Sequence, residues 1–236
     1  MIKNIYFLIR TTFAYQSTSR DSMARKLTWS QFVSSLFLAL ALTLFSQPVH
    51  ARGEANIPPL DVFIEQVTNG QADVLRGVYV PGMLASPIVP QPATASAFVS
   101  SAENTLTQFG LASRYGSVGL LAHNSLAGKN FSLLEPGQMF YLIYGDGTVT
   151  TFVVTDLLRF QALEPENVHS DFIDLDTGDT LTAADLFIKI YDQPGKVILQ
   201  TCITAHGSSS WGRLFISAEP YTSYESGYFF GLTSLY

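Results

Sequence analysis

Short runs of branched and aromatic residues, separated by polar and glycine-rich segments, recur along the C-terminal two thirds of the chain. They occupy residues 74–80, 117–122, 139–144, 148–154, 196–201 and 214–218. Runs of this length and composition predict β-strands. Gly145-Asp146-Gly147 separates two of them and predicts a hairpin turn, because glycine and aspartate accept positive φ at little cost. The pattern therefore predicts a mostly β domain.

Helical signals are fewer. Helices are expected at 60–67, 103–109 and 181–191. In the last of these, Thr182 is the expected N-cap and Asp185 completes a weak capping box. The segment Met83–Ser96 is rich in Pro, Ala, Ser and Thr, which predicts a long loop. The strand count favours a closed or nearly closed β-barrel with one or two short helices. There is no βαβ alternation and no glycine-rich phosphate loop, so a nucleotide cofactor is not expected.

The longest apolar run of the chain, Phe32–Phe45, lies near the N-terminus. Arg25 and Lys26 precede it, and the small residues Val49 and Ala51 follow it. Its 14 residues fall short of the roughly 20 that span a bilayer as a helix. We interpret it as a signal peptide cleaved after Ala51, with an uncleaved N-terminal anchor as the alternative.

This interpretation divides the chain into four parts. Residues 1–22 precede Met23 and read as a mis-assigned start, and residues 23–51 form the signal peptide or anchor. Residues 52–73 form a leader, and residues 74–236 form the β-barrel domain. Because a signal peptide or anchor directs export, we expect an extracytoplasmic protein that is secreted or associated with the cell envelope.

Composition and charge exclude several classes of protein and of partner. The chain is 47% hydrophobic and 14% charged, which excludes disorder and a coiled coil. With 13 Lys and Arg against 19 Asp and Glu, its net charge is −6, so nucleic acid is not an expected partner. Residues 52–236 alone carry −10, which favours cationic peptides or amines.

Three polar residues, His123, Cys202 and Arg213, each lie at the end of a predicted strand. In a barrel they would converge at one rim. A thiolate is a strong nucleophile, an imidazole moves a proton and a guanidinium binds an oxyanion, so together they suit acyl transfer. Cys202 is the single cysteine, so an intramolecular disulfide is impossible. A buried, inert thiol is the alternative interpretation.

The segment Leu199-Gln200-Thr201-Cys202, with Arg213 eleven residues later, resembles the strand–cysteine–loop–arginine signature of the sortase family. Gly119–His123 resembles the family's histidine segment, and Phe131–Leu134 leading to Pro136-Gly137-Gln138 resembles the stretch after it. The resemblance covers roughly residues 74–220.

The resemblance implies an eight-stranded barrel and a cysteine transpeptidase. Cys202 would cleave a sorting motif in a secreted protein through a thioacyl-enzyme, and an amine on a cell-wall precursor or pilin lysine would resolve it. His123 would shuttle protons. Arg213 would bind the substrate backbone and the oxyanion with the help of the Thr201 main chain, and Thr201 and Asn124 would thus contact substrate. Many family members carry arginine at the position of Asn124, so the contact there is expected to differ.

The resemblance implies no metal or organic cofactor, and we expect a monomer. Two other functions stay open. One is a cysteine hydrolase or endopeptidase on the same barrel, in which water replaces the amine. The other is a non-catalytic envelope-binding barrel, in which Cys202 is packed and inert.

The remaining candidates have simpler interpretations. His206 and His169 are interpreted as loop histidines, and His50 lies in the signal peptide. A solvated acidic loop is favoured over a calcium site for Asp171, Asp174, Asp176 and Asp179. A final strand or a lid on the barrel is favoured over a peptide-binding surface for Tyr221, Tyr224, Tyr228, Phe229 and Phe230.

Overall fold

Ten strands form one sheet in the computed structural model, which describes residues 57–167 and 169–222. The strands are β1 (Leu75–Val80), β2 (Leu84–Pro90), β3 (Leu106–Phe109), β4 (Val118–Leu121), β5 (Met139–Tyr144), β6 (Val149–Ala162), β7 (Phe172–Asp174), β8 (Thr180–Leu181), β9 (Val197–Ala205) and β10 (Ser208–Pro220). The helices are α2 (Leu60–Val67), α3 (Gly110–Arg114), α4 (Ala183–Tyr191) and the 3₁₀ helix η1 (Ala127–Leu133).

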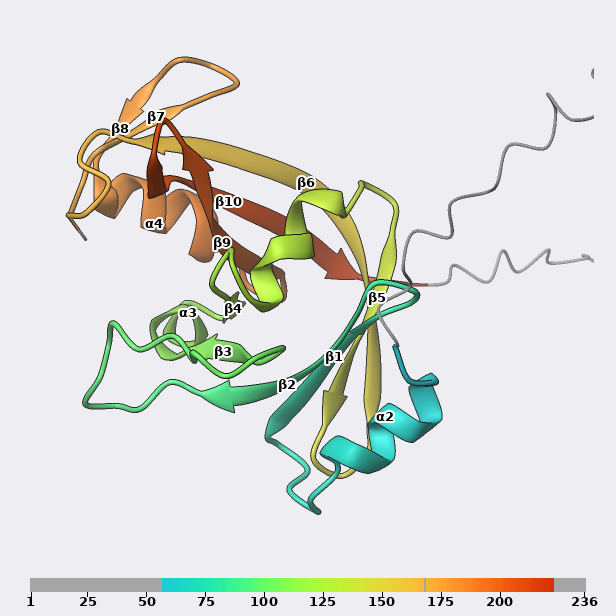
Figure 1. Ribbon diagram of the computed structural model, residues 1–236. Helices are drawn as coiled ribbons and strands as arrows, with labels where there is room; N and C mark the ends of the chain where they lie inside the picture. Colours follow the sequence, from blue (N-terminus) through green and yellow to red (C-terminus); the bar gives the residue numbers. More distant parts are fainter. Residues whose placement is uncertain (1–56, 168, 223–236) are drawn as a thin grey trace, which may run out of the picture. The chain divides into compact units, whose positions relative to one another are not determined.

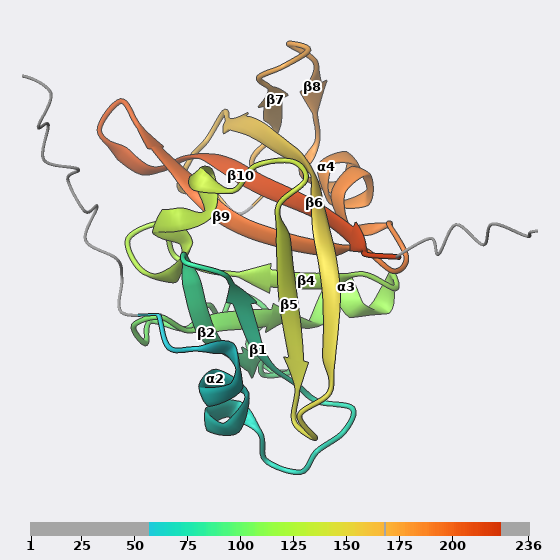
Figure 2. The ribbon, with the colours of Figure 1, turned by 90° about the vertical axis from the view of Figure 1, so that its right-hand side faces the viewer.

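A pairing between β6 and β10 closes the sheet. The strand order is β10-β9-β4-β3-β2-β1-β5-β6-β7-β8, and the β6–β10 ladder joins the first eight into a ring (Figures 1 and 2). Strands β7 and β8 extend from β6 outside the ring. The predicted mostly β, closed eight-stranded barrel with short helices is therefore confirmed.

Alternating side chains along each strand fill the barrel, because successive residues of a strand point to opposite faces. On β9, Val197 and Leu199 point inward, and on β10, Leu214 and Ile216 do the same. The interior also holds Phe140, which stacks on Phe152 with ring centroids 5.9 Å apart. The next residue along each strand consequently points outward, and this alternation orients the candidate site.

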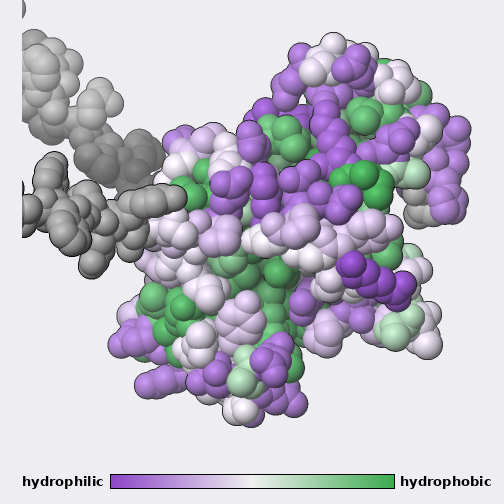
Figure 3. All heavy atoms as spheres, turned by 180° about the vertical axis from the view of Figure 1, so that it is seen from behind, coloured by the Kyte–Doolittle hydropathy of each residue, from purple (hydrophilic) through white to green (hydrophobic). Residues whose placement is uncertain are grey.

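Two further clusters cover parts of the outer surface. Helix α2 packs Phe63 and Val67 against Tyr79, Ala85 and Ile143 of β1, β2 and β5 (Figure 2). The predicted leader thus contributes a helix that packs on the barrel. Elsewhere on the outside, α3 and α4 cover β9, β10 and the end of β6. On the face turned away in Figure 1, hydrophilic side chains predominate and hydrophobic ones form separate patches (Figure 3).

Several local predictions are confirmed. Helix α2 has the expected bounds, and the Oγ of Thr182 caps α4 by accepting a hydrogen bond from the Asp185 backbone amide at 3.1 Å. Gly147 has φ of 86° in the β5–β6 hairpin. In the same turn, hydrogen bonds from Thr148 hold the pKa of Asp146 below its usual value.

Two predictions were wrong. The segment expected to be a loop contains β2, which pairs with β1 although Pro87 lies within it. Pro87 is exposed, while Ser86 is buried and donates its hydroxyl to the side chain of Asn104. The segment 103–109, expected to be helical, contains β3, and the helix begins only at Gly110. Pairing with β2 and β4 outweighs the weak local signal of this four-residue strand.

The predictions for residues 1–56 and for the tail beyond Thr222 lie outside the described residues. They concern the mis-assigned start, the signal peptide or anchor, its cleavage site, and the aromatic residues from Tyr224 on. Within residues 57–167 and 169–222, no helix is long and apolar enough to cross a membrane.

Candidate active site

Cys202 and Arg213 face each other across the β9–β10 ladder. The two residues are register partners in this antiparallel pair. Thr201 and Leu214, their neighbours, are buried and point inward, so Cys202 and Arg213 point to the outer face. Both side chains are half-buried. The thiol and the guanidinium therefore lie on the same side of adjacent strands.

His123 lies two residues after the end of β4, the strand on the other side of β9. Strand β4 runs parallel to β9, with Leu121 opposite Gln200, and the Ala122 amide donates to the Gln200 carbonyl at 3.0 Å. Two further steps of this register bring His123 level with Cys202. Ala122 packs in the barrel interior, and His123, the residue after it, is exposed. The structure therefore places Cys202 and Arg213 on the outer face of β9 and β10, and His123 just beyond the end of the neighbouring strand β4.

No hydrogen bond joins these three side chains in the described part of the chain. Arg213 instead donates from Nη1 to the carbonyl oxygens of Ser210, at 2.8 Å, and Gly212, at 3.0 Å. Its guanidinium carbon lies 5.9 Å from the ring centroid of Phe172 on β7. These contacts orient Arg213 and leave its remaining N–H groups without protein acceptors among the described residues.

A bulge in β10 supplies the carbonyl that orients Arg213. The register passes from Ser208 opposite Ala205 to Gly212 opposite Ile203, so extra residues accumulate on β10. Gly212 is required at the end of this bulge, because a Cβ there would lie 2.5 Å from the Phe160 carbonyl oxygen.

A tight turn connects β9 to β10 beyond the bulge. His206 and Gly207 form it, with φ of 49° and 81°. His206 is exposed and lies 5.5 Å from Trp211 between ring centroids. It is therefore a loop residue at the hairpin tip, as expected. His169 is also exposed, in the connection between β6 and β7.

Asn124 and Thr201, which were predicted to contact substrate, make internal hydrogen bonds. The Asn124 amide donates to Thr204 Oγ1 at 2.9 Å and to the Ser209 carbonyl at 2.8 Å. It thereby ties the residue after His123 to both strands of the hairpin. Thr201 is 4% exposed and donates its hydroxyl to the Ala122 carbonyl at 2.9 Å. Both side chains therefore connect the end of β4 to the β9–β10 hairpin through hydrogen bonds.

A hollow of about 200 Å³ borders Cys202 between β9 and the segment that contains Asn124 and η1. Its lining includes Asn124, Gly128, Lys129 and Ser132, but neither His123 nor Arg213. A Cβ at Gly128 would lie 2.9 Å from the His123 carbonyl oxygen, so glycine permits the close approach of this segment. Sequence reasoning missed Gly128 and Lys129, for which the sequence holds no motif.

Gln200, two residues before Cys202 on β9, is held by a buried tyrosine. The Tyr191 hydroxyl of α4 donates to Gln200 Oε1, and burial raises the pKa of Tyr191. The hydroxyl therefore stays protonated and links α4 to the strand that carries the thiol.

The acidic loop between β7 and β8 is held by contacts within the loop and by one ion pair to α4. Asp174 forms an ion pair with Lys189 at 3.0 Å and accepts hydrogen bonds from the backbone amides of Asp176 and Thr177. Asp179 accepts from the Thr177 hydroxyl at 2.8 Å, whereas Asp171 and Asp176 are exposed. Across 57–167 and 169–222, no three His, Cys, Asp or Glu side chains are grouped closely enough to hold a metal ion.

The Asp174 contacts predict a pH-dependent stability. Burial raises the pKa of Asp174, but the hydrogen bonds from Lys189, Asp176 and Thr177 outweigh it and hold the pKa below its usual value. The stabilisation is then fully present above the unfolded value of about 3.9 and is lost as pH falls through the folded pKa. Asp174→Asn is expected to cost about 1–3 kcal/mol at pH 7 in urea unfolding.

The difference between wild type and Asp174→Asn should shrink between pH 5 and pH 3. Asp176→Asn is the matched control, since its side chain is exposed, and should change stability by less than about 0.5 kcal/mol. A cost for Asp174→Asn that is the same at pH 3 and pH 7 would contradict the role of the charge.

No protein-family model matches the sequence, and no curated protein matches it. Among solved structures, sortase A from Corynebacterium diphtheriae is similar at 14% identity and a TM-score of 0.41, over 64% of this chain and 62% of that protein. The chain thus spans less than two thirds of that protein. Sortase C-1 from Actinomyces oris is similar at 17% identity and a TM-score of 0.42, over 72% of this chain and 85% of that one. Sortase C1 from Streptococcus suis is similar at 13% identity and a TM-score of 0.42, over 70% and 80%.

Proposed function

We propose that this protein is an exported sortase-type cysteine transpeptidase. The observation that carries the proposal is the placement of Cys202 and Arg213 as register partners on the outer face of β9 and β10, with His123 just beyond the end of β4, the strand on the other side of β9. The order and spacing of these residues in the sequence, which resemble the sortase signature, support the same conclusion. The substrate is a secreted protein with a sorting motif, and the acceptor is an amine of the cell envelope.

The first half-reaction cleaves the peptide. The Cys202 thiolate attacks the scissile carbonyl carbon, and the carbonyl electrons move to the oxygen. The N–H groups of Arg213 that are not bound to Ser210 and Gly212 donate to this oxyanion. As the oxyanion collapses, the C–N bond breaks, and protonated His123 gives its proton to the leaving amine. The product is a thioester on Cys202.

The second half-reaction transfers the acyl group. An acceptor amine attacks the thioester carbon and His123 removes its proton, so that the thiolate leaves and a new amide forms. If water attacks instead, the same residues release a free carboxylate, which is the hydrolase alternative. The nature of the acceptor, not a different set of residues, separates these two reactions.

The coupling of Cys202 to His123 can be tested without a known substrate. Purified protein is treated with iodoacetamide at pH values from 5 to 9, and the mass of the intact protein gives the alkylation rate. We expect one addition, abolished in Cys202→Ala. His123→Ala is expected to alter the pH dependence of the rate, because the imidazolium that stabilises the thiolate is gone.

His206→Ala is the matched control, because this histidine lies four residues after Cys202 but at the tip of the hairpin. Its pH profile should follow that of the wild type. A thiol that reacts only after denaturation, or a profile that His123→Ala leaves unchanged, would overturn the proposal in favour of a non-catalytic barrel.

A further inference from the structure

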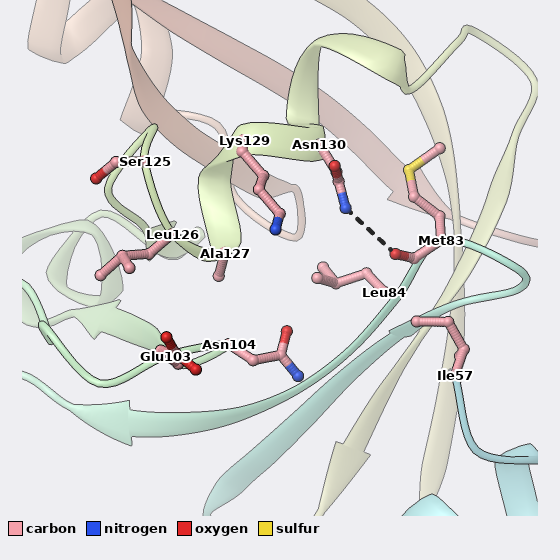
Figure 4. Close-up of a pocket in the computed structure, with 10 residues that line it drawn as sticks. All are labelled: Ile57, Met83, Leu84, Glu103, Asn104, Ser125, Leu126, Ala127, Lys129 and Asn130. Carbon is pink, nitrogen blue, oxygen red and sulfur yellow. Dashed lines mark hydrogen bonds between the residues drawn. The ribbon is translucent and has the colours of Figure 1, made fainter. Parts of the chain in front are cut away.

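A second and larger cavity lies on the other side of the segment that borders Cys202. Its volume is about 320 Å³, and four parts of the chain line it: Ile57 before α2, the turn from β1 into β2, the residues before β3, and the segment from Ser125 to Asn130 (Figure 4). Ligand sites usually have volumes of about 300–1,000 Å³. The cavity is therefore large enough for a small ligand such as one or two amino-acid units.

Hydrogen bonds within the protein hold the walls of this cavity in place. Asn104 has φ of 52°, and its amide donates to the Ala85 carbonyl at 2.6 Å and accepts from Ser86 Oγ at 2.7 Å. Asn130 donates to the Met83 carbonyl at 3.5 Å (Figure 4). The amide side chains of the cavity thus hold its walls together. Because they are used within the protein, other groups of the lining would recognise a ligand.

The charged groups that line the cavity are one carboxylate and one ammonium. Glu103 lies on the wall before β3, and Lys129 extends from η1 on the opposite wall (Figure 4). The ion pairs of residues 57–167 and 169–222 join Lys189 to Asp174 and Lys196 to Glu219, so neither Glu103 nor Lys129 is paired there. Leu84 and Leu126 supply apolar surface beside the two charges.

We propose that this cavity binds a zwitterionic amino-acid unit, such as a free amino acid or a dipeptide. Glu103 receives the ligand's ammonium group, Lys129 receives its carboxylate, and an apolar side chain of the ligand lies on Leu84 and Leu126. The two opposite charges match a ligand that carries both signs on a short backbone. This site is separate from the acyl-transfer chemistry and does not require Cys202 to be reactive.

The site adjoins the segment after His123. The His123 carbonyl accepts hydrogen bonds from the backbone amides of Leu126 and Gly128, both at 3.0 Å. Leu126 lines the large cavity, Gly128 lines the hollow at Cys202, and Lys129 lines both. A ligand in the large cavity consequently lies one segment away from the thiol.

The test titrates the full-length, ¹⁵N-labelled chain with the dipeptide alanyl-leucine and follows amide chemical shifts. We expect saturable shifts centred on Leu84, Glu103 and Leu126. N-acetylation or C-terminal amidation of the dipeptide should each weaken binding about two- to fivefold, because each removes one partly solvated charge pair.

Variants of the protein assign each charge. Glu103→Gln should weaken binding of the free dipeptide but not further weaken binding of the N-acetylated one. Lys129→Met should show the same relation with the amidated dipeptide. Glu135→Gln, just after η1 and outside the lining, is the matched control and should bind as the wild type does.

Three results would overturn the proposal. The first is no saturable shift up to about 10 mM dipeptide, the weak limit for such a site. The second is equal affinity for free and capped dipeptides, and the third is shifts centred away from the cavity. The Cys202→Ala chain should bind the dipeptide normally, so failure of the proposed acyl transfer would leave this result unaffected.

Discussion

Arg213→Ala is expected to slow acylation of Cys202 by p-nitrophenyl acetate about 10²-fold relative to alkylation by iodoacetamide. Acylation passes through an oxyanion, whereas alkylation does not, and loss of one oxyanion donor typically costs about 10²–10³ in rate. Both reagents react with the thiolate. The ratio of the two rates therefore cancels any change in thiolate population and isolates the contribution of Arg213 to the oxyanion.

Arg213→Lys should give an intermediate ratio. A lysine keeps the positive charge but lacks the planar fork that can bind the Ser210 and Gly212 carbonyls and still donate to a substrate. Arg114→Ala, at the end of α3, is the matched control and should leave the ratio unchanged. A ratio for Arg213→Ala within about threefold of wild type would mean that Arg213 holds the β10 bulge and does not stabilise the oxyanion.

Phe140→Ala is expected to lower the free energy of unfolding by about 3–5 kcal/mol. Phe140 is fully buried inside the barrel and stacks on Phe152, so its removal leaves a cavity that the closed ring of strands cannot collapse around. Domains of this size are stable by about 5–15 kcal/mol, so the loss is a large share of the total. Urea unfolding followed by far-UV circular dichroism measures it.

Met139→Ala is the matched control, because the neighbouring side chain on β5 is 44% exposed. Its effect should stay within about 0.5 kcal/mol. A loss below about 1 kcal/mol for Phe140→Ala would mean that the barrel interior repacks, contrary to the close packing seen in the structure.

Local chemistry explains the elements that could be predicted. The β5–β6 hairpin follows from Gly145-Asp146-Gly147, and the start of α4 follows from Thr182 and Asp185, since each depends on neighbours within a few residues. The long apolar strands were also found, because their branched side chains fill the barrel. Each of these signals lies inside the element that it predicts.

The predictions for the segments that form β2 and β3 failed because the interactions that make them strands involve residues elsewhere in the chain. Nothing within Met83–Ser96 shows that β1 will pair with β2, or that Asn104 will satisfy the buried hydroxyl of Ser86. Strand β3 has four residues, too few to separate a strand period from a helical one. In both cases pairing across the sheet outweighed local propensity.

The sequence by itself determined a mostly β domain, its hairpin and cap, and a histidine, a cysteine and an arginine that each end or begin an apolar strand. Only the tertiary structure decided that Cys202 and Arg213 share one outer face and that His123 follows the strand beside them, because that depends on the β4–β9 and β9–β10 registers. It also decided that Asn124 joins strands and that Glu103 and Lys129 face one cavity. Register and barrel closure bring together residues that are far apart in the chain, and no local sequence pattern encodes these long-range contacts.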